Sequence, residues 1–173
     1  MIRIVCNEDF ICTKIKDLLL QKNFYVSHQD PSFLFSCRIE NHNSSLQIKV
    51  DNNSFTLKKP FTIQLFLKQL RAIFSDKFIL FGNIKYFPFS QLIKQNQKKI
   101  ILTEIHNSIF FELLTNKNGI HKLDLYKKIW QNDKNININK LDTHLTNLKN
   151  ELKNSIEFQL NFISTKGILK INF

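Results

Sequence analysis

Glycine and proline are scarce in this sequence. The 173 residues include only 3 of each, which excludes collagen-like and linker-like compositions and leaves few sharp turns. Long hydrophobic runs are also missing, since no stretch reaches the roughly 18 apolar residues that a membrane-spanning helix needs. The short apolar start of the chain is soon broken by Asn7, Glu8 and Asp9. We therefore expect no signal peptide and no membrane partner.

Cysteine is rare as well. The three cysteines, Cys6, Cys12 and Cys37, are odd in number, lie in the first quarter of the chain and form no C-x-x-C pair. In a chain without a signal peptide, this pattern predicts reduced thiols and a cytoplasmic protein. Cys6 and Cys12 fit plain buried cysteines better than a redox switch.

The residue types of a catalytic or metal site are not grouped. The histidines are scattered without the spacing of metal ligands, which argues against a zinc or catalytic metal site. The sequence shows no nucleophile–base set and no glycine-rich phosphate loop. We therefore expect neither an enzyme nor a bound cofactor.

What is present is the composition of a basic globular protein. Apolar residues make up 43% and charged residues 23% of the chain, values typical of globular domains, and the length suits one domain or two small ones. The net charge is +11: residues 77–173 hold 15 Lys and 7 acids (+8), and residues 1–76 hold 10 basic and 7 acidic residues (+3). Such an excess implies an acidic partner, nucleic acid or an anionic surface.

Hydrophobic periodicity predicts an α/β arrangement in the first half. β-branched or alternating runs indicate strands, and apolar residues at helical spacing indicate helices. Asp51-Asn52-Asn53 has turn chemistry, whereas the stretch 29–45 shows no regular pattern. The expected strands are residues 2–5, 24–26, 46–50 and 54–58, and the expected helices are residues 10–22 and 61–74.

The second half begins near residues 75–77 and predicts strands, then three helices, then a hairpin. Thr103 is placed to cap the first of these helices, and Asn118-Gly119 supplies the positive φ that ends it. Ile136 and Ile138 are expected to be buried in the loop before the third helix. The expected strands are residues 78–87, 91–95 and 99–102, the later helices residues 121–130 and 140–153, and the hairpin strands residues 158–163 and 168–171 around a turn at 164–167.

Short motifs in the second half occur in the order of one known family. They are Ile101-Leu102-Thr103-Glu104, Glu112-Leu113-Leu114, Leu125 with Ile129-Trp130, the segment 141–149, and Ile163-Ser164-Thr165-Lys166-Gly167. Together these motifs resemble the OmpR-type winged-helix DNA-binding domain of bacterial response regulators. Two departures from that family are an asparagine, Asn147, where an arginine is usual, and a wing that lacks the second glycine.

The resemblance implies a DNA-recognition helix over residues 140–153. Its leucines, Leu141, Leu145, Leu148 and Leu152, are expected to face the core. The opposite side and the hairpin tip would then contact DNA, where amides pair with adenine and lysines with guanine or phosphates. The implied DNA-binding residues are Asn139, Lys140, Thr143, His144, Thr146, Asn147, Lys149, Asn150, Thr165 and Lys166.

These polar residues also have plainer interpretations. Any surface helix directs polar side chains outward, and any solvated hairpin has a polar turn. His144 is equally well interpreted as packing at the junction of helix and wing. Asp142 is expected to bond within its own domain, and Trp130 is expected to belong to the core.

The first half is similar to a receiver domain, but only at its two ends. Residues 2–5 with the next helix resemble the first β-α unit, and Leu57-Lys58-Lys59-Pro60-Phe61 resembles a receiver corner. The segment between them is too short for a five-stranded receiver. Cys6-Asn7 stand where the magnesium-binding acids belong, and Asp51 lies in a turn, so phosphorylation chemistry is expected to be lost. Lys59 is then left with a structural or solvent role.

We therefore expect two domains. Residues 1–75 are predicted to form a truncated, receiver-like α/β domain, and residues 77–173 an α+β winged helix-turn-helix. The predicted function is transcription regulation that is independent of phosphorylation. The alternatives are a phosphorylation-controlled response regulator and a DNA- or protein-binding winged helix without sequence preference. The expected partners are double-stranded DNA, a second copy of the chain bound through the helix at 62–74, and RNA polymerase.

Overall fold

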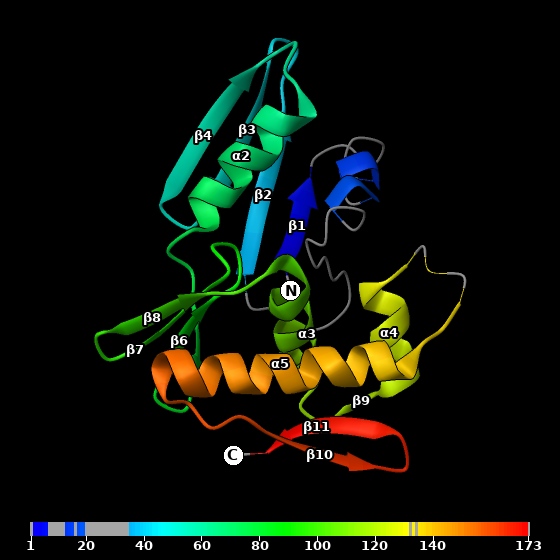
Figure 1. The fold of residues 1–173 in the computed structure, drawn as a ribbon. Coiled ribbons are helices and arrows are strands. Elements are labelled where there is room, and N and C mark those ends of the chain that lie inside the picture. Colours follow the sequence, from blue (N-terminus) through cyan, green and yellow to red (C-terminus); the bar gives the residue numbers. More distant parts are fainter. Residues whose placement is uncertain are drawn as a thin grey trace. The chain divides into compact units, whose positions relative to one another are not determined.

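The computed structural model describes residues 2–6, 13–15, 17–19, 35–131, 133 and 135–172. The chain forms two compact units, residues 1–77 and residues 78–173, which we call unit 1 and unit 2 and describe separately. Most of their strands and helices are labelled in Figure 1. None of the helices in these ranges is both long and apolar enough to cross a bilayer.

A four-stranded sheet is the framework of unit 1. Its strands lie in the order β1 (Ile2–Cys6), β2 (Phe35–Asn41), β3 (Ser45–Val50) and β4 (Asn53–Lys58). β1 is parallel to β2, and β2, β3 and β4 are antiparallel neighbours. Asp51, with a φ of 50°, lies in the tight turn between β3 and β4. This confirms the predicted turn and both strands beside it.

β2 was not predicted, because it lies in the stretch that shows no regular sequence pattern. Its burial nevertheless alternates, with Cys37 and Ile39 buried and Ser36 and Arg38 exposed. The predicted strand at residues 24–26 lies outside the described residues. The predicted helix at residues 10–22 is described only at residues 13–15 and 17–19, which are helical.

Helix α2 (Ile63–Phe74) packs its apolar side on the sheet of unit 1, where Phe66, Leu70 and Phe74 are buried. It begins at Thr62, whose hydroxyl accepts a hydrogen bond from the backbone N–H of Leu65 (3.2 Å), a common way to satisfy a free amide at a helix start. The helix predicted at residues 61–74 is therefore present, but it begins two residues later, at Ile63.

Unit 2 begins with a second four-stranded sheet. Its antiparallel strands follow the chain order: β5 (Ile79–Phe81), β6 (Ile84–Phe87), β7 (Leu92–Gln95) and β8 (Lys98–Ile101). One face is buried. Tyr86 on that face packs edge-on against Phe110 (4.9 Å between ring centroids), and its hydroxyl donates to the side-chain oxygen of Asn107 (2.7 Å).

Three helices and a small three-stranded sheet complete unit 2. The helices are α3 (Glu104–Thr115), α4 (Lys122–Ile129) and α5 (Ile138–Ile156). The sheet has the order β10-β11-β9, from β9 (Ile120–His121), β10 (Asn161–Thr165) and β11 (Ile168–Asn172). Mixed α/β structure and the order strands, three helices, hairpin both agree with the expectation from sequence.

Some boundaries differ from those expected. Thr103 does cap α3, accepting from the N–H of His106 (3.2 Å). The helix ends at Asn116 and not at Asn118-Gly119, and the Asn116 side chain donates to the carbonyl of Glu112 (2.6 Å). The prediction that Ile136 is buried was wrong: its side chain is 47% exposed. Helix α5 extends beyond the predicted segment at both ends.

Candidate nucleic-acid interface

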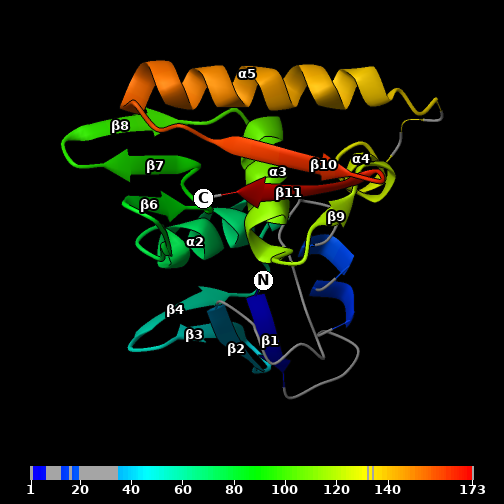
Figure 2. The same cartoon turned by 90° about the horizontal axis from the view of Figure 1, so that it is seen from below.

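Helix α5 lies along one edge of unit 2. Figure 2 shows it with α3 and the β10–β11 hairpin on its inner side. The leucines predicted to face the core do so: all four are buried, and Ile156 extends the same side by another turn. They are Leu141, Leu145, Leu148 and Leu152. Their spacing fixes which residues of the helix face outward.

The outward side of α5 is a stripe of neutral polar residues. It consists of Asn139, Thr143, Thr146, Asn147 and Asn150, all exposed. The hydroxyl of Thr143 donates to the carbonyl of Asn139 (2.8 Å), and that of Thr146 donates to the carbonyl of Asp142 (2.9 Å). The threonines can therefore offer a methyl group and an acceptor, while the asparagines offer both donors and acceptors.

The charged residues of α5 lie beside this stripe. Lys149 and Lys153 are exposed on one flank, and Lys166 and Lys170 are exposed on the hairpin. Within the ranges given above, none of the four has an acidic partner, whereas Lys122, Lys128 and Lys140 are all paired with carboxylates. Lys153 and Lys170 are not among the residues predicted to bind DNA. The alternation of buried and exposed residues along β11 could have identified Lys170 as an exposed lysine of the hairpin.

Two of the residues predicted to bind DNA, Lys140 and His144, make contacts within unit 2. The ammonium of Lys140 donates to Asp133 (3.1 Å) and lies 4.6 Å from the centroid of the Trp130 ring. The His144 ring is 5.4 Å from the Trp130 ring. His144 therefore packs toward α3 and α4 and not at the junction with the wing. Trp130 itself is only half-buried, so its assignment to the core was too strong.

His144 ends a chain of hydrogen bonds that joins α5 to α3. Nδ1 of His106 lies 2.7 Å from the Glu151 carboxylate, and Nε2 of His106 lies 3.4 Å from Nδ1 of His144. A carboxylate only accepts, so His106 donates to Glu151 and accepts from His144 in the neutral state. Burial, and then the nearby charges of His106 and Lys140, hold the pKa of His144 below its usual value of 6.5.

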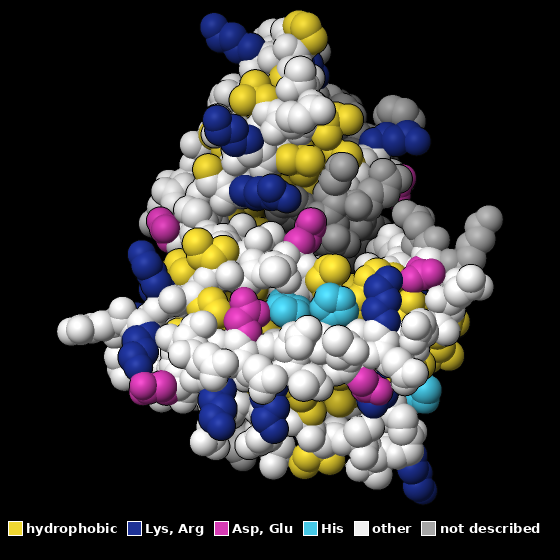
Figure 3. All heavy atoms as spheres, in the orientation of Figure 1, with side chains coloured by type: hydrophobic (Ala, Val, Ile, Leu, Met, Phe, Trp, Pro, Cys, Tyr) yellow, Lys and Arg dark blue, Asp and Glu magenta, His cyan; other side chains and the backbone are white. Residues whose placement is uncertain are grey.

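Figure 3 views this face of the protein from outside. The ridge of α5 is mostly white, the colour of backbone and neutral polar side chains, and two histidines lie next to each other along its flank. A surface of this kind can form hydrogen bonds with base edges at its centre and ionic contacts with phosphates at its sides.

The hairpin has a two-residue turn made by Lys166 and Gly167, tighter than the four residues expected. Both have positive φ, 51° and 78°, as type I′ hairpin turns require. A Cβ atom on Gly167 would lie 2.8 Å from Nε2 of His121, and the N–H of Lys122 donates to the Gly167 carbonyl (2.8 Å). The turn is thus attached to the start of α4, with Thr165 and Lys166 exposed.

Two other predictions from sequence concern acidic residues. Asp142 does bond within its domain, accepting from the ammonium of Lys122 (2.6 Å). Asp51 in the β3–β4 turn is ion-paired with Lys77. Among the described residues, no three or more histidine, cysteine or acidic side chains are arranged to hold a metal ion.

No known family profile matches the chain, and neither does any curated protein. Among solved structures, it is similar to the C-terminal domain of the nisin resistance regulator NsrR, a lantibiotic response regulator, with 26% identity, a TM-score of 0.44 and coverage of 53% of this chain and 93% of that chain. A RitR mutant is similar at 11% identity, with a TM-score of 0.47 and coverage of 98% and 65%. A protein from a family of redox sensors in the streptococci, described as evolved from two-component response regulators, is similar at 13% identity, with a TM-score of 0.47 and coverage of 99% and 67%. The chain thus spans about two thirds of the length of the last two.

Proposed function

We propose that the chain is a transcription regulator whose unit 2 binds duplex DNA as a winged helix-turn-helix. In this proposal α5 enters the major groove and the β10–β11 hairpin lies on neighbouring phosphates. The observation that carries it is one surface on which a stripe of neutral amides and hydroxyls is bordered by exposed lysines without acidic partners in the described part of the chain.

The dimensions and chemistry of α5 suit this role. A helix about 10–12 Å across fits the major groove, which is about 12 Å wide. Asparagines can make paired hydrogen bonds to adenine, and threonine methyl groups can contact thymine. Asn147, an exposed amide of the stripe, is the residue we expect to contribute most to base preference, since Lys140 and His144 are bound within unit 2.

The charge of unit 2 supports the same proposal. Residues 78–173 hold 14 Lys and 7 acidic residues, a balance of +7. Four of those acids are already ion-paired with lysines and Glu151 is bound to His106. The lysines beside α5 and on the hairpin therefore keep their full charge for phosphates, whose neutralisation makes binding depend on salt.

The salt dependence of DNA binding tests this arrangement. Lys149→Ala and Lys166→Ala should each weaken binding to every sequence and lower the log–log salt slope by about one, since each removes one phosphate contact. Lys85→Ala is the matched control, because it removes the same charge from an exposed position on β6. Asn147→Ala should leave the slope unchanged and alter the preference between sequences by about 1–3 kcal/mol.

Fluorescence anisotropy with labelled duplexes, at several salt concentrations, measures all four variants. Equal slopes for the wild type and the three lysine variants would place the interface elsewhere. If the wild type binds every duplex as tightly as it binds random DNA, the result would favour a winged helix without sequence specificity.

We also propose that this regulation does not require an aspartyl phosphate. Asp51, the aspartate that directly follows β3 in unit 1, lies in a two-residue turn and is ion-paired with Lys77. Incubation with acetyl phosphate should therefore give no stable phosphoprotein by mass spectrometry. Labelling of an aspartate, together with a change in DNA affinity, would support the phosphorylation-controlled alternative.

A further inference from the structure

Unit 1 contains a pocket that has no part in the proposed DNA interface. Its volume is about 570 Å³, which lies within the range of roughly 300–1,000 Å³ found for small-molecule sites. The lining is mostly apolar. It comprises Ile15, Leu18, Leu46, Phe61, Ile63 and Phe66, together with the polar residues Lys14, Asp17, Asn41 and Lys59.

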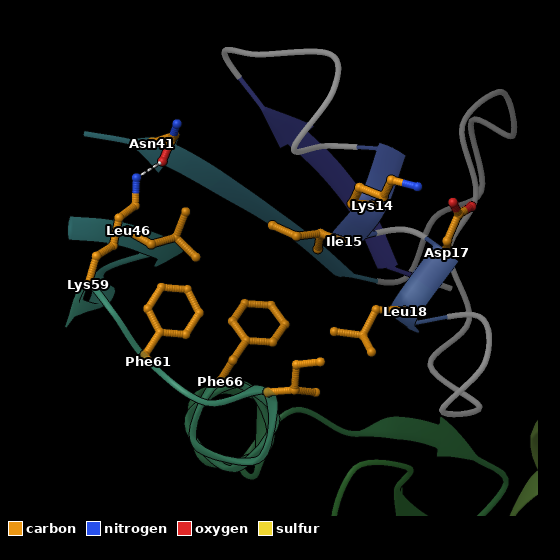
Figure 4. Close-up of a pocket in the computed structure, with 10 residues that line it drawn as sticks. Lys14, Ile15, Asp17, Leu18, Asn41, Leu46, Lys59, Phe61 and Phe66 are labelled. Atoms are coloured by element: carbon orange, nitrogen blue, oxygen red, sulfur yellow. Dashed lines mark hydrogen bonds between the residues drawn. The ribbon is translucent and has the colours of Figure 1, made fainter. Parts of the chain in front are cut away.

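The walls come from two helical segments and the sheet between them. Phe61 and Phe66 stack on each other, with ring centroids 6.4 Å apart, and form one wall. Ile15 and Leu18, from the helical residues 13–15 and 17–19, face them across the pocket (Figure 4). The pocket lies between the two phenylalanine rings on one side and Ile15 and Leu18 on the other. An apolar space of this size leaves its lining without dispersion partners, which a ligand would supply.

One end of the pocket carries an ammonium group that has no counter-ion among the described residues. Nζ of Lys59 donates to the side-chain oxygen of Asn41 (2.5 Å) and to the carbonyl of His42 (2.7 Å), as Figure 4 shows for the first of these. Both acceptors are neutral, and no acid among the described residues pairs with Lys59. An ammonium has three donors, so one N–H remains for a ligand.

The other charged residues of the lining do not change this balance. Lys14 and Asp17 lie together at the opposite end of the pocket in Figure 4 and have opposite charges. The lining as a whole therefore carries one net positive charge, at Lys59. The ligand that matches it has an apolar body and a single negative charge at one end.

We infer that this pocket binds a fatty acid of medium chain length. Its alkyl chain lies between the phenylalanine wall and the side chains of Ile15 and Leu18, and its carboxylate accepts a hydrogen bond from Lys59. Inorganic phosphate is a poor match because it has no apolar part to fill the pocket. Binding at this site is separate from DNA binding, so either proposal can fail without the other.

Calorimetry on the full chain with three ten-carbon ligands tests the inference. Decanoate should bind about tenfold more tightly than decanol, because a charge-assisted hydrogen bond adds to the same apolar contacts. Decyltrimethylammonium should bind more weakly than either. Lys59→Met should bring decanoate to the affinity of decanol and leave decanol unchanged. Equal affinity of the wild type for all three ligands would overturn the role of Lys59.

A matched pair of substitutions on α2 tests the position of the site. Ile63 and Leu65 are both exposed, at 52% and 41%, but only Ile63 lines the pocket. Ile63→Glu should weaken decanoate binding about tenfold or more by repulsion, and Leu65→Glu should leave it unchanged. Equal losses in both variants would indicate non-specific adsorption. Sedimentation of the wild type with phosphatidylcholine vesicles would assign the acyl chain to a membrane lipid and overturn a free fatty acid as ligand.

Discussion

At the scale of single residues, tertiary neighbours decide which polar side chains of α5 remain available. Lys140 and His144 both lie on the polar part of the helix in sequence, yet both contact Trp130. His144 also reaches His106, 38 residues earlier in the chain. The sequence pattern around His144 gives no indication of this contact with His106. The neutral residues of the stripe could be identified from leucine spacing alone, whereas the inward contacts of these two could not.

The lowered pKa of His144 makes the stability of unit 2 depend on pH. In the unfolded chain its imidazole takes up a proton near its usual pKa of 6.5, while in the folded chain it stays neutral to lower pH. Below pH 6.5 the unfolded state therefore binds more protons, and the free energy of unfolding falls until the folded pKa is passed. The stabilising effect is thus present at pH 7.5 and lost on acidification.

Comparison with His144→Gln isolates this effect, because the other histidines are present in both proteins. Urea denaturation followed by the fluorescence of Trp130, the single tryptophan of the chain, reports on unit 2. The stability of the wild type relative to the variant should decrease between pH 7.5 and pH 5. Parallel curves for the two proteins would show that His144 titrates normally.

At the scale of helices and strands, strong periodicity could be predicted from the sequence and tertiary pairing could not. The four leucines of α5 repeat at helical spacing over three turns, and the helix forms where they indicate it. β2 buries only Cys37 and Ile39 among seven residues, and it is defined mainly by pairing with β1 and β3. At the end of α3 the Asn116 side chain donates to the carbonyl of Glu112, a contact that hydrophobic periodicity does not indicate.

The β5–β8 sheet carries a row of like charges that periodicity does not explain. Lys85 lies directly opposite Lys94 on the neighbouring strand, and Lys94 lies opposite Lys99 on the next. Three exposed lysines therefore lie side by side across β6, β7 and β8. Like charges in directly opposed positions destabilise a sheet. Lys85 and Lys94 also lie over the rings of Phe78 and Phe87, at 5.2 and 5.1 Å, which offsets part of the repulsion.

Among the described residues, no ring contact of this kind involves Lys99, so it is the position at which the repulsion can be tested alone. Lys99→Glu should raise the free energy of unfolding of unit 2 by up to about 1 kcal/mol, because a like-charge pair with Lys94 becomes an opposite pair. Lys99→Gln, which only removes the repulsion, should give a smaller gain. Both gains should shrink in high salt. Denaturation followed by Trp130 measures them, and an unchanged stability at low salt would mean that solvent already screens the row.

At the scale of the whole molecule, the sequence predicted the basic half and the order of its elements. The structure adds which of the described lysines are paired with described acidic residues and which are not. Composition alone cannot separate Lys128, paired with the buried Glu112 at 2.8 Å, from Lys149, which is exposed beside α5. Of the 14 lysines in residues 78–173, we expect those near the stripe to contribute most to the binding of DNA phosphates. The net charge therefore indicates the class of partner, and the pairing pattern indicates the surface.

A second copy of the chain would present a second α5. We propose that two copies associate through α2, whose exposed Leu65 is an apolar position outside its buried side. Each α5 would then occupy one half-site, and two half-sites should lie about 10–10.5 base pairs apart, one helical turn of DNA. Sequences selected from a random duplex pool should contain such tandem repeats.

Insertions between the selected half-sites test the paired arrangement. Five extra base pairs place the second half-site on the opposite face of the duplex and should abolish cooperative binding, while ten should restore much of it. Leu65→Glu should lose cooperativity but keep the affinity for a single half-site, because unit 2 is unaltered. Cooperative binding that persists in Leu65→Glu would place the contact between copies outside α2, since a buried glutamate in that contact would be unpaired.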